Sequence, residues 1–420
     1  MNRFKKIRIQ GFKSIVDQEF EPGQVNVLIG ANGSGKTALL EAIGMLSAAM
    51  NGRVDNGALQ GRGVRLGTPQ LYKSAFRGVD TQRISLSLNW QDEQTQEKLE
   101  YFVTLGHPNN KPEQAWYYQD EHVSLNDKLI RQRTLLEEHQ DFLVNNVQKT
   151  ANVRPTKPDR GIGFDAVLSG VENHNLQRLL EALKSYAIYT PTTPALRDLF
   201  TDITPLETVF PVSFFGNRLA QAIEYLIDIE NETYGHLDLD DVLELLDWTE
   251  NVAAGTANSE ILSPYVPRLQ QVIRFTDRFM RENNNVLTAY DASEGSLYVL
   301  FLLTIAVHPH APRLFAVENF DQALNPRLAR ATADLFCQAI LDNDNPRQPI
   351  AFLTTHNPLV LDGIDILDDR IRLFAIDRDS SGYTTINRVT VTEELLEKGK
   401  QGMTLSDLWV MGLLGGVPRL

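Results

Sequence analysis

The sequence predicts an α/β fold that opens with a strand, a glycine-rich loop and a helix. Residues 25–29 are apolar and read as a buried strand, glycines follow over 30–35, and helical spacing continues to about Ala49. Two later apolar runs, Arg313–Val317 and Pro349–Thr354, have the composition of buried parallel strands, with a helical pattern between them. Strands and helices that alternate in this way indicate a parallel sheet covered by helices.

The composition is that of an ordinary globular protein. The 420 residues are too many for one compact domain, and 42% of them are hydrophobic while 22% are charged. No apolar run approaches the roughly 20 residues that cross a bilayer, and the first residues begin a strand pattern, not an apolar signal segment. The single cysteine, Cys337, excludes an internal disulfide and a multi-cysteine metal site. We therefore expect a cytoplasmic protein with no membrane partner.

The charge balance is acidic, with a net charge of −14 at pH 7. Proteins that wrap DNA usually carry a basic balance, so this charge lowers the expectation of direct DNA binding without excluding a local basic face. Positive charge does gather near the start of the chain, either on a solvated edge strand or in contact with phosphates. The residues concerned are Arg3, Lys5, Lys6, Arg8 and Lys13.

Strand patterns follow the first helix. Arg83–Trp90 and Leu99–Leu105 alternate apolar and polar residues, and Ala115–Tyr118 is a weaker candidate. Together they suggest an antiparallel β-subdomain. We assign residues 1–123, which also hold the glycine loop, to the first lobe of the fold.

The middle of the chain, residues 124–287, reads as mainly helical and is predicted to be an insertion. Its stretch Leu219–Pro267 contains many acids and neither Lys nor Arg, which fits a partner site or a solvated helix face. Residues 288–420 return to the α/β pattern and form the second lobe. They contain a late strand pair, Arg370–Ile376 and Tyr383–Val391, and then a short helix.

The loop over residues 30–37 fits the phosphate-binding pattern G-x-x-x-x-G-K-[ST] in full. Glycines let the backbone curl so that its N–H groups point at phosphate oxygens. Lys36 is expected to place its cation on the β- and γ-phosphates, and the Thr37 hydroxyl to ligate Mg²⁺. The sequence therefore predicts a bound nucleotide. The predicted binding residues are Gly30, Asn32, Gly33, Ser34, Gly35, Lys36 and Thr37.

Four segments follow the loop in a fixed order: Asp291–Ser296, Leu314–Asn319, Gln322–Pro326 and Thr354–Pro358. In this order they resemble the signature segment, Walker B strand, D-loop and switch region of ABC-type ATPases, in the form found in the RecF/SMC-like class. The opening Ile9–Ser14 is similar to the first strand and loop of that class, from which Lys13 or Ser14 could approach the phosphates. The resemblance implies an ABC-type P-loop NTPase head with an antiparallel β-subdomain and a helical insertion.

The resemblance also implies that ATP and Mg²⁺ are held between two protomers. Ser293, which would cap its helix, would then face the γ-phosphate held on the other protomer. His356 would contact the γ-phosphate, while Thr37 and Glu318 would hold the metal. The catalytic residues that the resemblance implies are Lys36, Glu318, Asn319, His356 and Ser293.

Two residues depart from the pattern of the class. Glu318 stands where the class has the Asp of the Mg²⁺ shell, and Asn319 where it has the Glu that activates water. Because Asn cannot act as a general base, hydrolysis would be slow, absent or supported by another group, of which Asp321 is the nearest carboxylate. A long-lived closed state would suit a sensor or a scaffold better than a motor.

Three further segments resemble stand-alone bacterial ATPases of this class: Tyr189–Pro191, Leu196-Arg197 and Leu405–Pro418. Several of these ATPases belong to anti-phage systems, and the chain is similar to the ATPase components of Septu and PARIS. The resemblance implies a homodimer or higher oligomer that works beside a separate effector, such as a nuclease or a toxin. The alternative is a RecF-like ATPase of DNA repair or chromosome maintenance that binds DNA directly.

One motif is similar to part of a nuclease site within the chain. Asp377-Arg378-Asp379 resembles the D-x-D of a Toprim domain, which follows the ATPase in one related class of nucleases. Too little chain comes after it, and that chain has no second acidic cluster suited to two metals. We therefore do not expect a nuclease within this chain.

Overall fold

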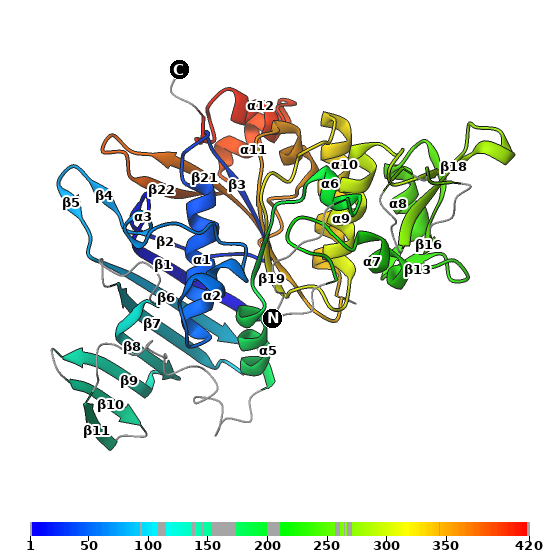
Figure 1. Cartoon of the computed structure of the whole chain (residues 1–420). Coiled ribbons are helices and arrows are strands. Elements are labelled where there is room, and N and C mark those ends of the chain that lie inside the picture. The colour runs from blue at the N-terminus through cyan, green and yellow to red at the C-terminus, as the bar shows by residue number, and fades with distance from the viewer. Residues whose placement is uncertain are drawn as a thin grey trace. The chain divides into compact units, whose positions relative to one another are not determined.

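The computed structural model forms two compact units (Figure 1). The first comprises Met1–Ile188, Asp369–Val391 and Gly412–Leu420, and the second comprises Tyr189–Asp368 and Thr392–Met411. The structure describes residues 2–92, 95–107, 115–136, 139–144, 147–152, 174–199, 211–256, 261–263, 265–266, 271–343 and 345–417. Pro418, at the end of the predicted tail, lies outside these residues.

The first unit contains an antiparallel sheet of eight strands in the order β11-β10-β9-β8-β7-β6-β1-β2. Along β6 every second side chain is buried, as expected when one face of a sheet packs on a core. The predicted antiparallel β-subdomain is therefore confirmed. Its strands are β1 Asn2–Phe12, β2 Ile15–Phe20, β6 Arg83–Asp92, β7 Lys98–Gly106, β8 Tyr117–Leu125, β9 Lys128–Leu136, β10 His139–Val144 and β11 Val147–Asn152.

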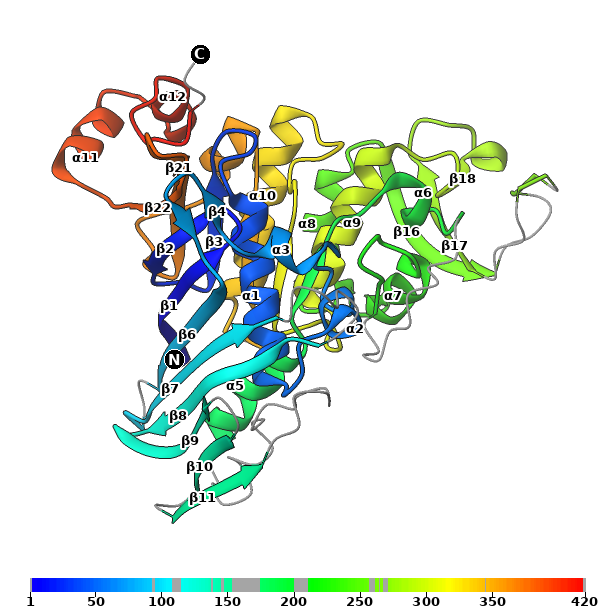
Figure 2. The ribbon, with the colours of Figure 1, turned by 60° about the vertical axis from the view of Figure 1, so that its left-hand side comes forward.

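Strand β3 (Val25–Ile29) of the same unit is fully buried and pairs in parallel with β21 (Ile371–Arg378). Strand β21 pairs antiparallel with β22 (Thr384–Val389), as the sequence predicts for the late strand pair. Helix α1 (Lys36–Met50) begins directly after the glycine loop and lies against the eight-stranded sheet (Figures 1 and 2). Smaller elements are α2 Asn56–Gln60, α3 Pro69–Tyr72, β4 Ala75–Phe76, β5 Val79–Asp80 and α5 His174–Lys184.

Two tyrosine hydroxyls fix helix α1 in this unit. The Tyr118 hydroxyl, from β8, donates to the carbonyl of Ala49 over 2.9 Å, and the Tyr186 hydroxyl donates to the carbonyl of Leu40 over 2.9 Å. Both tyrosines are buried, so their polar tips need these partners. The helix that follows the glycine loop is thereby held near its start, at Leu40, and near its end, at Ala49.

The second unit is built around two parallel strands, β19 (Leu314–Val317) and β20 (Ile350–Thr354), joined by helix α10 (Pro326–Leu341). Helix α9 (Glu294–Val307) is buried almost throughout. Both predicted parallel strands are therefore confirmed. Strand β12 (Ala187–Tyr189) begins in the first unit and ends at the first residue of the second. The other elements of the second unit are α6 Thr193–Leu196, α7 Leu219–Leu226, β13 Ile227–Asp228, β14 Thr233–Tyr234, β15 Leu237–Asp238, α8 Leu239–Leu245, β16 Thr249–Thr256, β17 Gln271–Asp277, η1 Glu282–Asn284, β18 Val286–Thr288, η2 Pro358–Gly363, α11 Glu393–Lys400 and α12 Leu405–Val410.

The expectation that residues 124–287 are mainly helical is wrong for the described residues. Helices α5, α7 and α8 do lie there, but so do β9 to β11, and β16 to β18 form a three-stranded antiparallel sheet. Short amphipathic runs cannot be assigned to a helix or a strand by periodicity alone, because cross-strand partners decide between them. The three-part division at residues 123 and 287 stays a prediction.

Strand β1 pairs with β2 on one side and with β6 on the other, so the interpretation of its basic residues as an edge strand is wrong. Among the described helices, none is long and apolar enough to cross a membrane.

Candidate functional site

The phosphate loop joins β3 to α1 within the first unit. Gly33 and Gly35 have φ angles of 77° and 117°, a region that side chains with a Cβ rarely occupy. A Cβ on Gly35 would also collide with the Thr384 side chain, whereas nothing packs over Gly33. The curled backbone that the motif requires is therefore present, and glycine is needed for it.

Lys36 closes this loop from the inside. Its side chain is buried, and its ammonium donates to the carbonyls of Gly30 and Ala31 over 2.7 and 3.1 Å. Helix α1 starts at the same residue, and its N-cap is Gly35, which has no side chain to cap the first N–H groups. The Ser34 hydroxyl is buried without a hydrogen-bond partner among the described residues. A buried cation, an uncapped helix N-terminus and a buried hydroxyl together favour an anionic ligand.

The remaining predicted loop residues lie nearby. Asn32 is exposed at the outer turn of the loop, and Thr37 is half-buried in the first turn of α1. The seven predicted binding residues are thus brought together within one unit.

Lys13 and Ser14, the candidates for phosphate contacts in the opening segment, are held by protein groups. The Lys13 ammonium forms an ion pair with Glu41, and its φ is 48°. The Thr384 hydroxyl lies 2.8 Å from the Ser14 hydroxyl, and the Thr384 amide donates to the Ser14 carbonyl over 2.8 Å. Ser14 is therefore linked through Thr384 to Ser34 of the loop, and Lys13 is linked to Glu41 of α1.

Glu41 forms a buried charge cluster that our sequence reasoning missed. Its carboxylate, on α1, is completely buried and accepts from the Arg65 guanidinium over 2.8 Å as well as from Lys13. The Lys13 ammonium lies 5.2 Å from the ring centre of Tyr72. The sequence feature that points to this cluster is Glu41 itself, a lone acid in the apolar run Leu39–Ile43. A buried acid of this kind needs cationic partners, which the sequence alone does not locate.

The second unit holds the residues after β19. Glu318 is half-buried, and its backbone amide donates to the Tyr189 carbonyl over 2.9 Å. Asn319 is exposed with φ 58°, its amide donates to the Thr354 hydroxyl over 2.9 Å, and its carbonyl accepts from the Tyr298 hydroxyl over 2.8 Å. Asparagine is among the few residues that tolerate this left-handed conformation. The turn after β19 is therefore fixed by backbone bonds and leaves the Asn319 side chain at the surface.

Asp321 ties this turn to the segment after β20. One oxygen of its carboxylate accepts from the Thr355 hydroxyl over 2.7 Å and from the His356 amide over 3.1 Å. Because β19 and β20 are parallel, the residues that follow them meet at one edge, and the structure brings Glu318, Asn319 and His356 to it. The His356 side chain is exposed there.

The segment that resembles the ABC signature begins helix α9. The Ser293 hydroxyl accepts from the Ser296 amide over 3.2 Å, so its predicted capping role is confirmed. The Trp248 indole donates to the Ser296 hydroxyl over 3.1 Å. A Cβ on Gly295 would lie 3.0 Å from the carbonyl of Ala323, so the start of α9 packs closely on the D-loop. Ser293 itself stays exposed.

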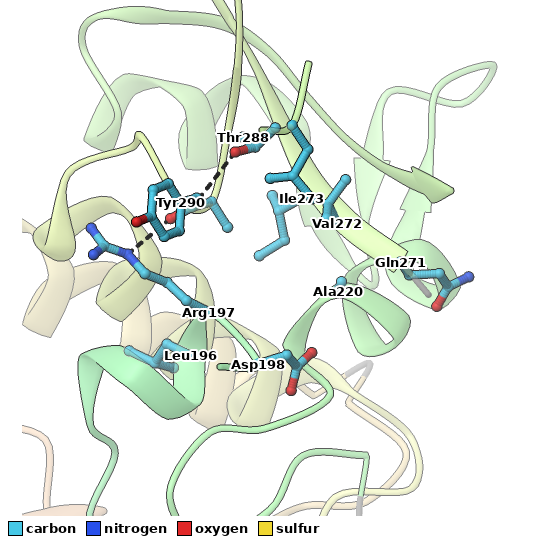
Figure 3. Close-up of a pocket in the computed structure, with 11 residues that line it drawn as sticks. Leu196, Arg197, Asp198, Ala220, Gln271, Val272, Ile273, Thr288 and Tyr290 are labelled. Carbon is cyan, nitrogen blue, oxygen red and sulfur yellow. Dashed lines mark hydrogen bonds between the residues drawn. The ribbon is translucent and has the colours of Figure 1, made fainter. Parts of the chain in front are cut away.

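Arg197 holds the chain just before the signature segment. Its guanidinium donates to the carbonyls of Ala289 and Ala292 over 3.0 and 3.1 Å. It lines a small surface pocket together with Asp198, Thr288 and other residues (Figure 3). In the sequence, Arg197 stood out only as part of the segment Leu196-Arg197 that resembles stand-alone ATPases, and no role could be predicted for it. Its structural role is to fix the approach to Ser293.

Two of the basic residues of β1 are paired with acids on β2. The Lys6 ammonium lies 3.0 Å from Glu19, and the Arg8 guanidinium lies 2.7 Å from Asp17. Hydrogen bonding to Arg8 holds the pKa of Asp17 below its usual value. These pairs favour a solvated, charge-balanced surface over a phosphate-binding one at this place.

The solved structures that are similar to the chain include three SMC heads. An SMC head bound to the C-winged helix domain of ScpA gives a TM-score of 0.50 at 11% identity, over 94% of this chain and 99% of that one. The SMC head domain from Thermotoga maritima gives 0.38 at 13% identity, over 93% and 100% of the two chains. An Smc head with an extended coiled coil, bound to the C-terminal domain of ScpA derived from Pyrococcus furiosus, gives 0.43 at 12%, over 96% and 98%. At such identity, the first likeness shows a shared fold alone.

The sequence was also compared with protein families. No functionally curated protein matches it. The profile of one family, described as "AAA domain, putative AbiEii toxin, Type IV TA system", matches residues 25–362. That span runs from β3 and the phosphate loop through the segment after β20. The protein therefore belongs to this AAA-domain family, and it shares its fold with an SMC head.

Proposed function

We propose that this protein binds ATP with Mg²⁺, closes into a homodimer or higher oligomer around the nucleotide, and thereby controls a separate effector protein. The observation that carries the proposal is the phosphate loop. A buried lysine, glycines in left-handed conformations and an uncapped helix N-terminus converge there. Such a loop favours the phosphates of a nucleotide over other ligands of similar charge.

Each site residue has a role in this proposal. Lys36 meets the β- and γ-phosphates in place of its present carbonyl partners, and the loop amides surround the phosphate oxygens. Thr37 and Glu318 hold Mg²⁺, which neutralises phosphate charge. His356 and the Ser293 of a second copy contact the γ-phosphate. Because ATP favours closure only through its greater affinity for the closed state, these contacts must form mainly after closure.

Slow hydrolysis follows from Asn319 in the same proposal. An amide cannot accept the proton of an attacking water, and Asp321 already accepts two hydrogen bonds from the segment that carries His356. Recruiting Asp321 as a base would disturb that segment. A closed state that persists would transmit a lasting signal through residues 124–287, as a sensor or scaffold requires.

The effector is proposed to be a protein, such as a nuclease or a toxin in anti-phage defence. The description of the family, with its toxin–antitoxin system, supports this class of role. The similar SMC head is bound to a domain of ScpA, which by analogy supports a protein partner. Direct DNA binding, as in a repair ATPase, is less well supported, because Lys6 and Arg8 are paired with acids.

The first test is the mass of the protein in solution with and without ATP and Mg²⁺. We expect a shift from monomer to dimer when ATP is added, with little phosphate released from the same sample. The shift should disappear when the nucleotide is removed. Rapid phosphate release would contradict the proposed sensor role. A mass that does not change with ATP would contradict closure around the nucleotide.

The second test replaces Asn319 by Glu. A positioned general base contributes on the order of a hundredfold or more, so turnover of Asn319→Glu should rise by about that factor. The matched control is Asn319→Gln, which has the same length and the same backbone cost at φ 58° but no basic group. Equal turnover of the two variants, with ATP binding intact, would show that Asn319 does not occupy the water-activating position.

A further inference from the structure

We infer that Arg378 is a positioning residue for the phosphate loop, an inference that rests on the proposed nucleotide binding. Arg378 ends strand β21 in the unit that contains the loop, and its side chain is exposed. Its guanidinium donates to the carbonyl of Gly33 over 2.8 Å and to the carbonyl of Gly382 over 2.7 Å. It therefore bridges the outer turn of the loop and the β21–β22 turn.

Thr384 makes the companion contact from the opposite strand. It is paired with Arg378 in the β21–β22 register, and its hydroxyl donates to the carbonyl of Ser34 over 2.7 Å. Two consecutive carbonyls of the loop, those of Gly33 and Ser34, are thus held by one cross-strand pair. Among the described residues, apart from its two chain neighbours, no atom lies within 4 Å of a Cβ placed on Gly33, so packing on that side does not fix this part of the loop.

The planarity of the peptide unit makes these two bonds matter for ligand binding. In a trans peptide the carbonyl of one residue and the N–H of the next point in opposite directions. A carbonyl of Gly33 that is held by Arg378 turns the Ser34 amide to the opposite side, where it donates to the Ala31 carbonyl over 3.2 Å. The bond from Thr384 orients the Gly35 amide in the same way. Backbone amides of such a loop are the groups that cradle phosphate oxygens.

The neighbours of Arg378 explain the D-x-D motif that resembled a nuclease site. The Asp377 carboxylate accepts from the Gly416 amide over 2.9 Å, and Gly416 packs against Gly30 at the start of the loop. The Asp379 carboxylate accepts from the amides of Ser381 and Tyr383 over 2.8 and 2.9 Å. Both acids are occupied by backbone donors, so the motif supports the loop and its turn.

Arginine suits this position for a geometric reason. Its planar guanidinium presents several N–H donors in a rigid fork, so a single side chain can hold two carbonyls at once. A lysine ammonium is a point charge on a flexible stem and would hold one of them at best. The two side chains should therefore differ in how well they orient the loop.

The experiment measures ATP–Mg²⁺ affinity by titration calorimetry for wild type, Arg378→Ala, Arg378→Lys and Arg388→Ala. We expect Arg378→Ala to weaken affinity about tenfold, the effect of losing a charge-assisted bond, and Arg378→Lys to restore part of it. Arg388, on β22, is the matched control, because its guanidinium pairs with Asp369 over 2.6 Å and not with the loop. Its replacement should leave affinity unchanged.

The melting temperature without nucleotide separates positioning from general stability. Because Arg378 is exposed, Arg378→Ala should melt close to the wild-type temperature without ATP. Its melting temperature should rise less than that of wild type when ATP is added. Unchanged affinity in Arg378→Ala while wild type binds ATP would overturn this inference alone. A loss of nucleotide-free stability in Arg378→Ala that is as large, in free energy, as its loss of ATP binding would also overturn the inference. A wild-type chain that binds no ATP would overturn the proposed function together with it.

Discussion

Replacing Lys36 by Ala is expected to abolish the stabilisation of the protein by ATP. The buried ammonium is the cation that the loop holds ready, and its removal leaves the loop without positive charge at its centre. A ligand at a hundred times its dissociation constant stabilises a protein by about 2.7 kcal/mol. In Lys36→Ala this gain should vanish, and a thermal melt with and without ATP–Mg²⁺ measures it.

The control for this variant is Lys6→Ala. Lys6 is an exposed lysine of the same unit, and its ion pair with Glu19 is of the surface kind that contributes little. It should keep the full shift with ATP. Because Lys36→Ala also removes partners of the Gly30 and Ala31 carbonyls, each variant is compared with itself without nucleotide. A full shift in Lys36→Ala would refute the assignment of the loop.

Replacing Glu41 by Ala is expected to destabilise the fold by about 3 kcal/mol, the effect of breaking a buried ion pair from one side. The carboxylate is fully buried, and its loss leaves the half-buried Lys13 ammonium without its counter-charge. Arg65 is two-thirds exposed and can return to water, so its contribution is small. Urea unfolding, followed by the midpoint and the slope, measures the change.

Glu19→Ala is the matched control, because Glu19 is an acid of the same unit that pairs with a lysine at the surface. Its effect should stay within about 0.5 kcal/mol. Glu41→Gln keeps the shape of the side chain, so its loss of unfolding free energy should fall between those of Glu41→Ala and Glu19→Ala. If Glu41→Ala unfolds at the same urea concentration as Glu19→Ala, the buried cluster does not stabilise the unit.

The parts predictable from the sequence share one property, which is that their chemistry is local. The phosphate loop is contiguous, so its residue types and their spacing carry the geometry of Lys36 and the glycines. Strands β19 and β20 are short apolar runs, and full burial selects that composition wherever they lie. The N-cap of α9 depends on Ser293 and the amide three residues later.

The parts that the sequence did not predict depend on partners far away in the chain. Arg197 bonds to carbonyls at Ala289 and Ala292, and no pattern around Arg197 points to them. Strands β16 and β17 pair with each other across residues 257–270, and their alternation is too short to distinguish from a helix. Strand identity there is settled by cross-strand packing.

The pairing of β3 with β21 has a consequence for how the protein is made. Strand β3 leads directly into the phosphate loop, yet its parallel partner, together with Arg378 and Thr384, is encoded far along the chain. Contacts between such distant segments form late, because closing a long loop costs entropy before any contact repays it. On the ribosome, a nascent chain displays the glycine loop well before it can be completed. Competence for nucleotide is therefore a late event in synthesis, and chains that stop early carry the motif without the partner strand that supports it.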